Sequence, residues 1–184
     1  MNKICSIDAS TNSMAFAIFY DDKLVKYGKI NFSGGNTFEK VGDAARKTKA
    51  IFDIFDVEYI VIEQVVFLNS PKTLLDLTLV QGSIIGAAIS SGIKRAVSVP
   101  PITWQNYLGN KALTKEEKFK LMSENPGKSK SWYKNNERSV RKNRTIKLIE
   151  INYDKIITDN DVSDAIGIGH YAVNNMDKLK GLTD

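Results

Sequence analysis

VEYIVIEQ, residues 57–64, is a short and largely apolar run that stops at an acidic side chain, Glu63. Such a run is typical of a central strand that is buried on both faces of a sheet. A carboxylate at the end of a buried strand is costly unless something compensates its charge. Ligands of α/β proteins gather outside the strand ends. Glu63 is therefore a candidate site residue.

The segments around this run alternate between strand and helix patterns. Residues 1–30 read as a β-hairpin that turns at Asp21-Asp22, and Thr37 is a candidate cap for a helix over 38–55. Later segments predict helices over 72–91, 102–108, 139–151 and 161–176, and a strand over 96–99 that stops at two prolines. This order favours an α/β fold with a mixed sheet. We expect residues 1–184 to form a single domain.

Composition narrows the class of protein. The chain has 184 residues, of which 42% are hydrophobic and 26% charged, as in ordinary globular proteins. A single cysteine, Cys5, allows no internal disulfide and fits a reducing compartment. One His and one Cys exclude zinc-finger sites, so carboxylates must hold any metal, which favours Mg²⁺ or Mn²⁺. We find no signal peptide and no stretch long enough to span a bilayer, and expect a soluble, intracellular protein.

The positive charge is concentrated in residues 111–147. This segment has twelve Lys/Arg and four Asp/Glu, an excess of eight, whereas the whole chain has an excess of five. Such a segment is typical of a polyanion-binding patch, and a merely solvated surface is the alternative. Trp132 and Tyr133 interrupt it, and Trp132 could stack on an unpaired base or pack on its own domain. Residues 123–134, rich in Ser, Lys, Pro and Gly, are expected to form a mobile loop.

Four acidic residues could form one metal site: Asp8, Glu63, Asp161 and Asp164. Asp8 and Glu63 end predicted strands, and the other two share one face at the start of the last helix. Singly, each has a simpler explanation as a turn residue or as a first-turn helix charge. Together they could surround two divalent cations about 3.5–4 Å apart, an arrangement that promotes in-line phosphoryl displacement.

Other residues of the last helix have structural explanations. Asp159 or Asn160 is the candidate N-cap of this helix. We expect His170 to point away from the acids, because it follows Asp164 by six residues. Gly167 and Gly169 are poor helix formers, which indicates a close approach of the helix to the sheet.

Three of these motifs, in this order, resemble the RuvC-type Holliday junction resolvases of the RNase H-like superfamily. They are Ile7-Asp8 followed by a small polar turn and AFAIF, the stretch VIEQ at residues 61–64 with the helix that carries Gln81-Gly82, and DVSDAIGIG at residues 161–169. The resemblance covers most of the chain. It implies an RNase H-like fold, with a five-stranded mixed sheet flanked by helices.

The resemblance also implies an activity and a set of roles. It makes Asp8, Glu63, Asp161 and Asp164 the ligands of two Mg²⁺ ions, for which Mn²⁺ would substitute. It implies a homodimer, partly formed by the helix from Lys72, that nicks a four-way DNA junction symmetrically and leaves 5′-phosphate and 3′-hydroxyl ends. No nucleotide cofactor and no membrane are expected. The location implied is the bacterial cytosol, or the host cytosol for a phage-encoded protein.

Several positions depart from the family pattern. Ala9-Ser10 stands where the family usually has a Gly, and Val66 stands where a Phe probes the junction, so Phe67 becomes the candidate for that contact. One family Lys falls near Trp104, and another is matched by Lys115, with Lys118 as its rival. The insertion over about 111–145 is longer and more basic than in cellular bacterial enzymes, which suggests a divergent bacteriophage member.

The basic residues of this insertion are expected to contact DNA phosphates, which positions the substrate but does not read its sequence. They are Lys115, Lys118, Lys120, Lys128, Lys130, Lys134, Arg138, Arg141, Lys142, Arg144 and Lys147.

Two further functions remain as alternatives to junction resolution. The first is a nuclease of the same superfamily that debranches forks and flaps, and the second is a DNA-binding module without catalysis. An actin-like ATPase is excluded, because 184 residues cannot supply two such domains with glycine-rich phosphate loops.

Overall fold

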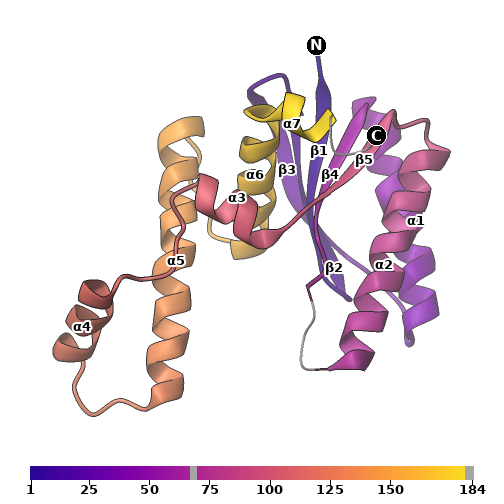
Figure 1. Ribbon diagram of the computed structural model, residues 1–184. Coiled ribbons are helices and arrows are strands. Elements are labelled where there is room, and N and C mark those ends of the chain that lie inside the picture. Colours follow the sequence, from indigo (N-terminus) through magenta and orange to yellow (C-terminus); the bar gives the residue numbers. More distant parts are fainter. Residues whose placement is uncertain (67–69, 181–184) are drawn as a thin grey trace.

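A mixed sheet of five strands forms the centre of the molecule (Figure 1). The computed structural model describes residues 1–66 and 70–180. The strand order is β3-β2-β1-β4-β5. The pairs β1–β2 and β2–β3 are antiparallel, whereas β1–β4 and β4–β5 are parallel. This arrangement confirms the predicted mixed sheet flanked by helices.

The elements follow the predicted order of strands and helices. They are β1 (Lys3–Ala9), β2 (Ser13–Tyr20), β3 (Lys23–Asn31), α1 (Thr37–Phe55), β4 (Tyr59–Glu63), α2 (Pro71–Ser90), β5 (Arg95–Val99), α3 (Pro101–Tyr107), α4 (Lys115–Glu124), α5 (Lys130–Tyr153), α6 (Asn160–Val173) and α7 (Met176–Lys180). To the predicted order the structure adds α4 and α7, and the last predicted helix, over 161–176, ends already at Val173. The turn at Asp21-Asp22 connects β2 to β3 as expected.

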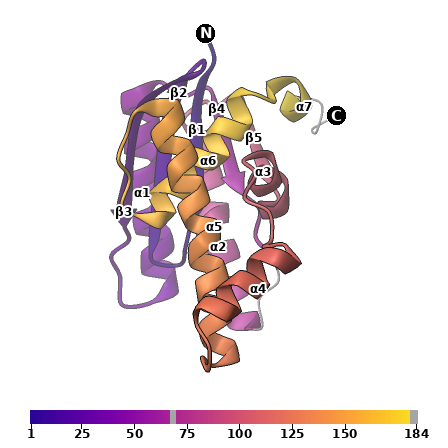
Figure 2. The same cartoon turned by 90° about the vertical axis from the view of Figure 1, so that its left-hand side faces the viewer.

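Helices cover both faces of the sheet and enclose one apolar core on each side (Figures 1 and 2). α1 and α2 pack on one face, where Ile7 and Ile62 are buried. α6 packs on the other face with α3 and α5, where Ile4 and Val61 are buried. Because side chains alternate along a strand, Asp8 and Glu63 project on the same side as Ile4 and Val61, toward α6.

Glycines let α6 approach its neighbours closely. A Cβ atom added at Gly169 would lie 2.1 Å from the Phe19 ring and 2.5 Å from the Ser6 hydroxyl. That hydroxyl donates a hydrogen bond to the Ala165 carbonyl of α6 at 2.7 Å. The predicted approach of the helix to the sheet is therefore confirmed at Gly169. Gly167 instead faces the side chains of α3 and α5.

The basic segment is more helical than its composition indicated. A loop is present over only 125–129 of the expected 123–134, because α4 extends to Glu124 and α5 begins at Lys130 and not at Ser139 as predicted. The Thr114 hydroxyl accepts from the Glu117 amide, and the Glu117 carboxylate accepts from the Thr114 amide, which caps α4. No residue of α4 is buried. The helix is held on α5 partly by an ion pair between Lys118 and Glu137 at 2.9 Å.

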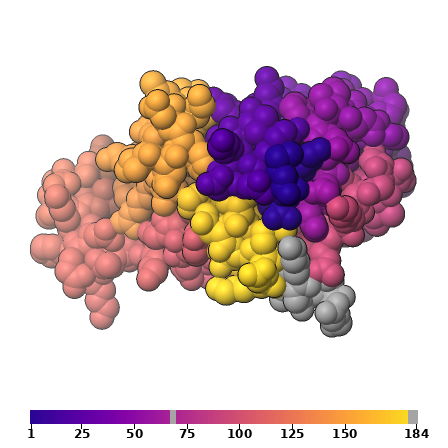
Figure 3. Space-filling view, turned by 90° about the horizontal axis from the view of Figure 1, so that it is seen from above, coloured from indigo at the N-terminus to yellow at the C-terminus, as the bar shows by residue number. Residues whose placement is uncertain are grey.

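We call α4, the connection over 125–129 and the N-terminal half of α5 the basic arm. It extends away from the sheet and its covering helices (Figure 1), and Figure 3, viewed from the end where the chain begins, shows it reaching to one side.

Two further expectations need correction. Asn36, and not Thr37, caps α1, since its side chain accepts a hydrogen bond from the Glu39 amide. By length and composition α2 could cross a membrane, contrary to the expectation that no stretch could. One face of α2 nevertheless packs in the core through Val80, Ile84 and Ala88, as in a helix of a globular domain.

Candidate active site

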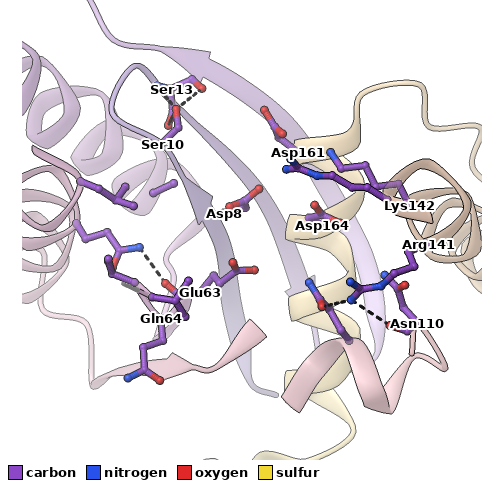
Figure 4. Close-up of a pocket in the computed structure, with 17 residues that line it drawn as sticks. Asp8, Ser10, Ser13, Glu63, Gln64, Asn110, Arg141, Lys142, Asp161 and Asp164 are labelled. Carbon is purple, nitrogen blue, oxygen red and sulfur yellow. Dashed lines mark hydrogen bonds between the residues drawn. The ribbon is translucent and has the colours of Figure 1, made fainter. Parts of the chain in front are cut away.

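A cavity of about 400 Å³ opens where β1 and β4 end, between the sheet and α6 (Figure 4). All four acids singled out in the sequence line it: Asp8, Glu63, Asp161 and Asp164. They come from two strands and one helix that are far apart in the chain. The fold thus brings together the carboxylates that the sequence analysis proposed to act together.

The two strand acids are fixed by the ends of parallel strands. Asp8 is the penultimate residue of β1, and Glu63 is the last residue of β4. The Glu63 carboxylate accepts a hydrogen bond from Trp104 Nε1 at 2.9 Å, and its backbone carbonyl accepts one from Gln81 Nε2 at 2.9 Å. Trp104 lies near the position at which the resemblance places a family Lys, and here its indole holds the glutamate.

The two helix acids are placed by the cap of α6. Asp159 is the N-cap, confirming one of the two candidates, and its Oδ1 accepts from the amides of Asp161 and Val162 at 2.8 and 3.2 Å. Asp161 Oδ2 lies 2.6 Å from Lys29 Nζ, and Asp164 is half-buried. Lys29, on β3, was not identified from the sequence.

Burial leaves three of these carboxylates poorly compensated. Together with the nearby charges of Glu63 and Asp164, it raises the pKa of Asp8 to about 8. Burial raises the pKa of Glu63 to about 7 against the opposing effect of the Trp104 hydrogen bond, and raises the pKa of Asp164 to about 6. Burying several ionised carboxylates in one cavity costs free energy, and a bound cation would offset that cost.

The donor chemistry fits Mg²⁺ or Mn²⁺, since all four groups supply oxygen ligands and the described residues that line the cavity include no thiolate or imidazole. Within residues 1–66 and 70–180, however, no three acidic, His or Cys side chains are already gathered closely enough to hold a metal. Asp161 is engaged by Lys29 and Glu63 by Trp104. Binding a metal therefore requires some of these side chains to move.

Basic side chains from α5 line the cavity beside the acids. They are Arg138, Arg141 and Lys142, of which Figure 4 labels the last two. The Arg141 guanidinium donates to Gln105 Oε1 at 2.7 Å and to the Asn110 carbonyl at 3.4 Å, so it is held in place. The charge of Lys142 lowers the pKa of Asp164 and that of Asp8.

Other residues singled out in the sequence lie elsewhere. Lys115 and Lys118 belong to α4 and are not among the residues that line the cavity. Phe67 lies outside the described residues. Trp132 lies in the first turn of α5 and packs edge-on against the adjacent Tyr133 with ring centroids 5.3 Å apart, so its stacking on a base stays a prediction.

His170 points away from the acids, as predicted. Its Nδ1 lies 2.7 Å from the Tyr153 hydroxyl, between α6 and α5, and it does not line the cavity.

Comparisons with known proteins show similarity at the level of the fold. Neither protein-family models nor curated proteins match the sequence. Among solved structures, Thermus thermophilus RuvC in complex with a Holliday junction substrate is similar, with a TM-score of 0.68, 12% identity and 96% of each chain covered. A second Thermus thermophilus RuvC structure also gives a TM-score of 0.68 at 12% identity, covering 96% of this chain and 97% of the other. The yeast mitochondrial Holliday junction resolvase Ydc2 gives 0.52 at 12% identity, covering 98% of this chain and 81% of the other. The chain thus has the RNase H-like fold of the RuvC-type Holliday junction resolvases.

Proposed function

We propose that this protein is a metal-dependent, structure-specific DNA endonuclease that resolves Holliday junctions. The observation that carries the proposal is the cavity in which the four acids of β1, β4 and α6 face the basic side chains of α5. Acids alone would repel a DNA backbone, and basic groups alone would only bind it. Their combination supports phosphodiester hydrolysis, in a fold shared with a resolvase solved on its junction substrate.

Asp8, Glu63, Asp161 and Asp164 would hold two divalent cations, Mg²⁺ or, as a substitute, Mn²⁺. Such a pair of ions activates a water molecule and stabilises the leaving 3′ oxygen of an in-line displacement. The acids themselves position the reaction at the end of the sheet, where two parallel strands fix Asp8 and Glu63. Trp104 orients Glu63, and its ring excludes water from that side because it is fully buried.

Arg138, Arg141 and Lys142 would pair with the phosphates on either side of the cut bond. Such contacts position DNA without reading its sequence. We assign the catalytic positive charge that the family resemblance gave to Lys115 to Lys142 instead, because Lys142 lines the cavity and Lys115 does not. Lys115 would then belong to the DNA-binding surface of the basic arm.

A homodimer would supply the two active sites that paired, symmetrical nicks require. The outer face of α2 supports this arrangement, because Leu75 and Ile89 on that face are 60% and 65% exposed. Gly82, seven residues from each of them, has no atom within 4 Å of an added Cβ. Residues seven apart share a helix face, so a second copy could pack closely on this apolar strip.

Asp8→Asn tests the proposal most simply. The variant should bind a four-way junction in Mg²⁺ as the wild type does and should nick it at a rate reduced by several orders of magnitude. Lys155→Gln, which changes an exposed lysine that does not line the cavity, is the control and should cleave normally. Nicking that survives Asp8→Asn would contradict the assignment.

One observation favours a second candidate, a nuclease that debranches forks and flaps as well as junctions. The basic arm carries exposed lysines far along its length, including Lys128, Lys130 and Lys134. Contacts of this kind follow the phosphate backbone of any duplex. A fork cleaved as fast as a four-way junction would support this broader activity.

A further inference from the structure

Lys29 of β3 is not among the residues that line the cavity, but it pairs with one of the cavity's acids, Asp161. In the sheet, Asp8 is in register with Ala15 of β2, and Ala15 is in register with Lys29 of β3. Residues opposite one another project on the same face of a sheet, so Lys29 and Asp8 both project toward α6, roughly 10 Å apart at their backbones. The strand register therefore places the positive charge of Lys29 on the same face of the sheet as Asp8.

The amino group of Lys29 contacts the first turn of α6 at two points. Its Nζ lies 2.6 Å from Asp161 Oδ2 and 3.3 Å from Asp159 Oδ2. Asp159 cannot follow a movement of Lys29 easily, because its other oxygen caps the helix through two backbone amides. Within the described residues the Asp161 carboxylate accepts no backbone hydrogen bond, so Lys29 is what holds it in its present position.

We propose that Lys29 is a positioning residue that competes with the divalent cation for Asp161. In the metal-free protein it holds the Asp161 carboxylate at the β3 side of the cavity. A metal ion held by Asp8 and Asp164 gains Asp161 as a ligand only when Asp161 leaves Lys29. The inference rests on the proposed function, since it takes the four acids as the metal site.

The competition explains why the acids line one cavity without forming a gathered metal site within the described residues. The strength of the Lys29–Asp161 ion pair determines how much this competition weakens metal binding. The side chains of Lys29 and Asp161 are 31% and 42% exposed, and ion pairs this exposed are weak. Removing the competitor should therefore tighten metal binding by about two- to fivefold.

The experiment is isothermal titration of Ca²⁺ into the DNA-free protein of residues 1–184 at low ionic strength. Ca²⁺ binds to oxygen ligands without any need for turnover. Lys29→Met should bind Ca²⁺ about two- to fivefold more tightly than wild type. Lys29→Arg keeps the pair with Asp161 and should bind as the wild type does.

Lys26→Met is the matched control, because Lys26 is an exposed residue of the same strand with no ion pair in the described part of the chain. It loses the same charge and should leave Ca²⁺ affinity unchanged. In an Asp161→Asn background, Lys29→Met should no longer tighten Ca²⁺ binding. If Lys29→Met instead acted by altering the stability of the fold or the electrostatic potential at the site, the tightening would persist in that background.

The outcomes separate this inference from the proposed function. If wild type binds Ca²⁺ but Lys29→Met binds it equally or more weakly, the competition is refuted while the metal site stands. If Lys26→Met tightened Ca²⁺ binding equally, the competition would also be refuted. The effect would then come from the loss of a positive charge on β3, and not from the release of Asp161. Absence of Ca²⁺ binding in wild type would overturn the metal site and the inference together.

Discussion

Asp8→Asn should stabilise the metal-free protein at mildly basic pH, although it removes a residue essential to the proposed activity. Burial, followed by the charges of Glu63 and Asp164, raises the pKa of Asp8 from 3.8 to about 8. The folded state therefore binds a proton that the unfolded state has lost. By linkage, stability falls as pH rises from about 4 towards 8, and asparagine, which keeps the shape without the charge, escapes this loss.

The pKa shift sets an upper limit on the gain. A difference of about four pKa units at about 1.4 kcal/mol each gives a ceiling of about 6 kcal/mol at pH 8. Water in the open cavity and relaxation of the neighbouring acids reduce this value, so we expect about 1–3 kcal/mol. At pH 5 the ceiling is only about 1.6 kcal/mol, because pH 5 lies about 1.2 units above the unfolded pKa of 3.8 and folded wild type still has Asp8 protonated.

The assay is urea unfolding followed by circular dichroism, with a chelator present, at pH 5 and pH 8. Asp43→Asn is the control of opposite sign. Asp43 accepts a hydrogen bond from the Ser33 amide at 2.7 Å and pairs with Lys47 and Arg46 at 2.7 and 2.9 Å, and the Lys47 contact most strongly lowers its pKa. That variant should lose stability at pH 8. A loss of stability in Asp8→Asn at pH 8, or a gain that does not grow with pH, would refute the reasoning.

Three further predictions concern packing, DNA and assembly. Gly169→Ala should lower the free energy of unfolding in urea by about 1–3 kcal/mol or more, because the new methyl group would overlap the Phe19 ring. Gly42→Ala is the control and should be neutral or stabilising by about 0.5–1 kcal/mol, because an added Cβ at Gly42 meets nothing within 4 Å. Equal effects of the two substitutions would contradict the close packing at Gly169. Ile89→Glu should convert a dimer to a monomer in sedimentation, and an unchanged dimer would place the interface elsewhere. The exposed lysines of the basic arm include Lys128, Lys130 and Lys134, whose replacement by Gln should lower the affinity for a junction and weaken the dependence of that affinity on salt. An unchanged salt dependence would show that the arm does not contact DNA.

The strands and the acids could be predicted because their signals are local. An apolar run that ends in Glu63 identifies both a buried strand and the residue at its end. Asp161 and Asp164 were found by their spacing in the first turn of a predicted helix. Gly169 was found because glycine has a low helix propensity and yet lies within that predicted helix. Each of these features depends on neighbours within a few residues.

The remaining site residues could not be found in this way because their partners are distant in the chain. Lys29 reaches Asp161 only through the register of three strands and the position of α6. Lys142 was named among the eleven basic residues expected to contact DNA, but only the course of α5 shows that it lies beside the acids and that Lys115 does not. The helix α4 did have a local signal, since Thr114 and Glu117 have the spacing of a capping box, but the high content of polar residues hid it.

The most direct test of the central claim is a cleavage assay in Mg²⁺ on a mobile four-way junction, beside a fork and a linear duplex, with the ends of every product mapped. Junction resolution predicts paired nicks placed symmetrically on opposite strands, with 5′-phosphate and 3′-hydroxyl ends, and no cuts in the linear duplex. Tight binding to the junction without any cut, or cuts of equal rate in the linear duplex, would contradict the claim.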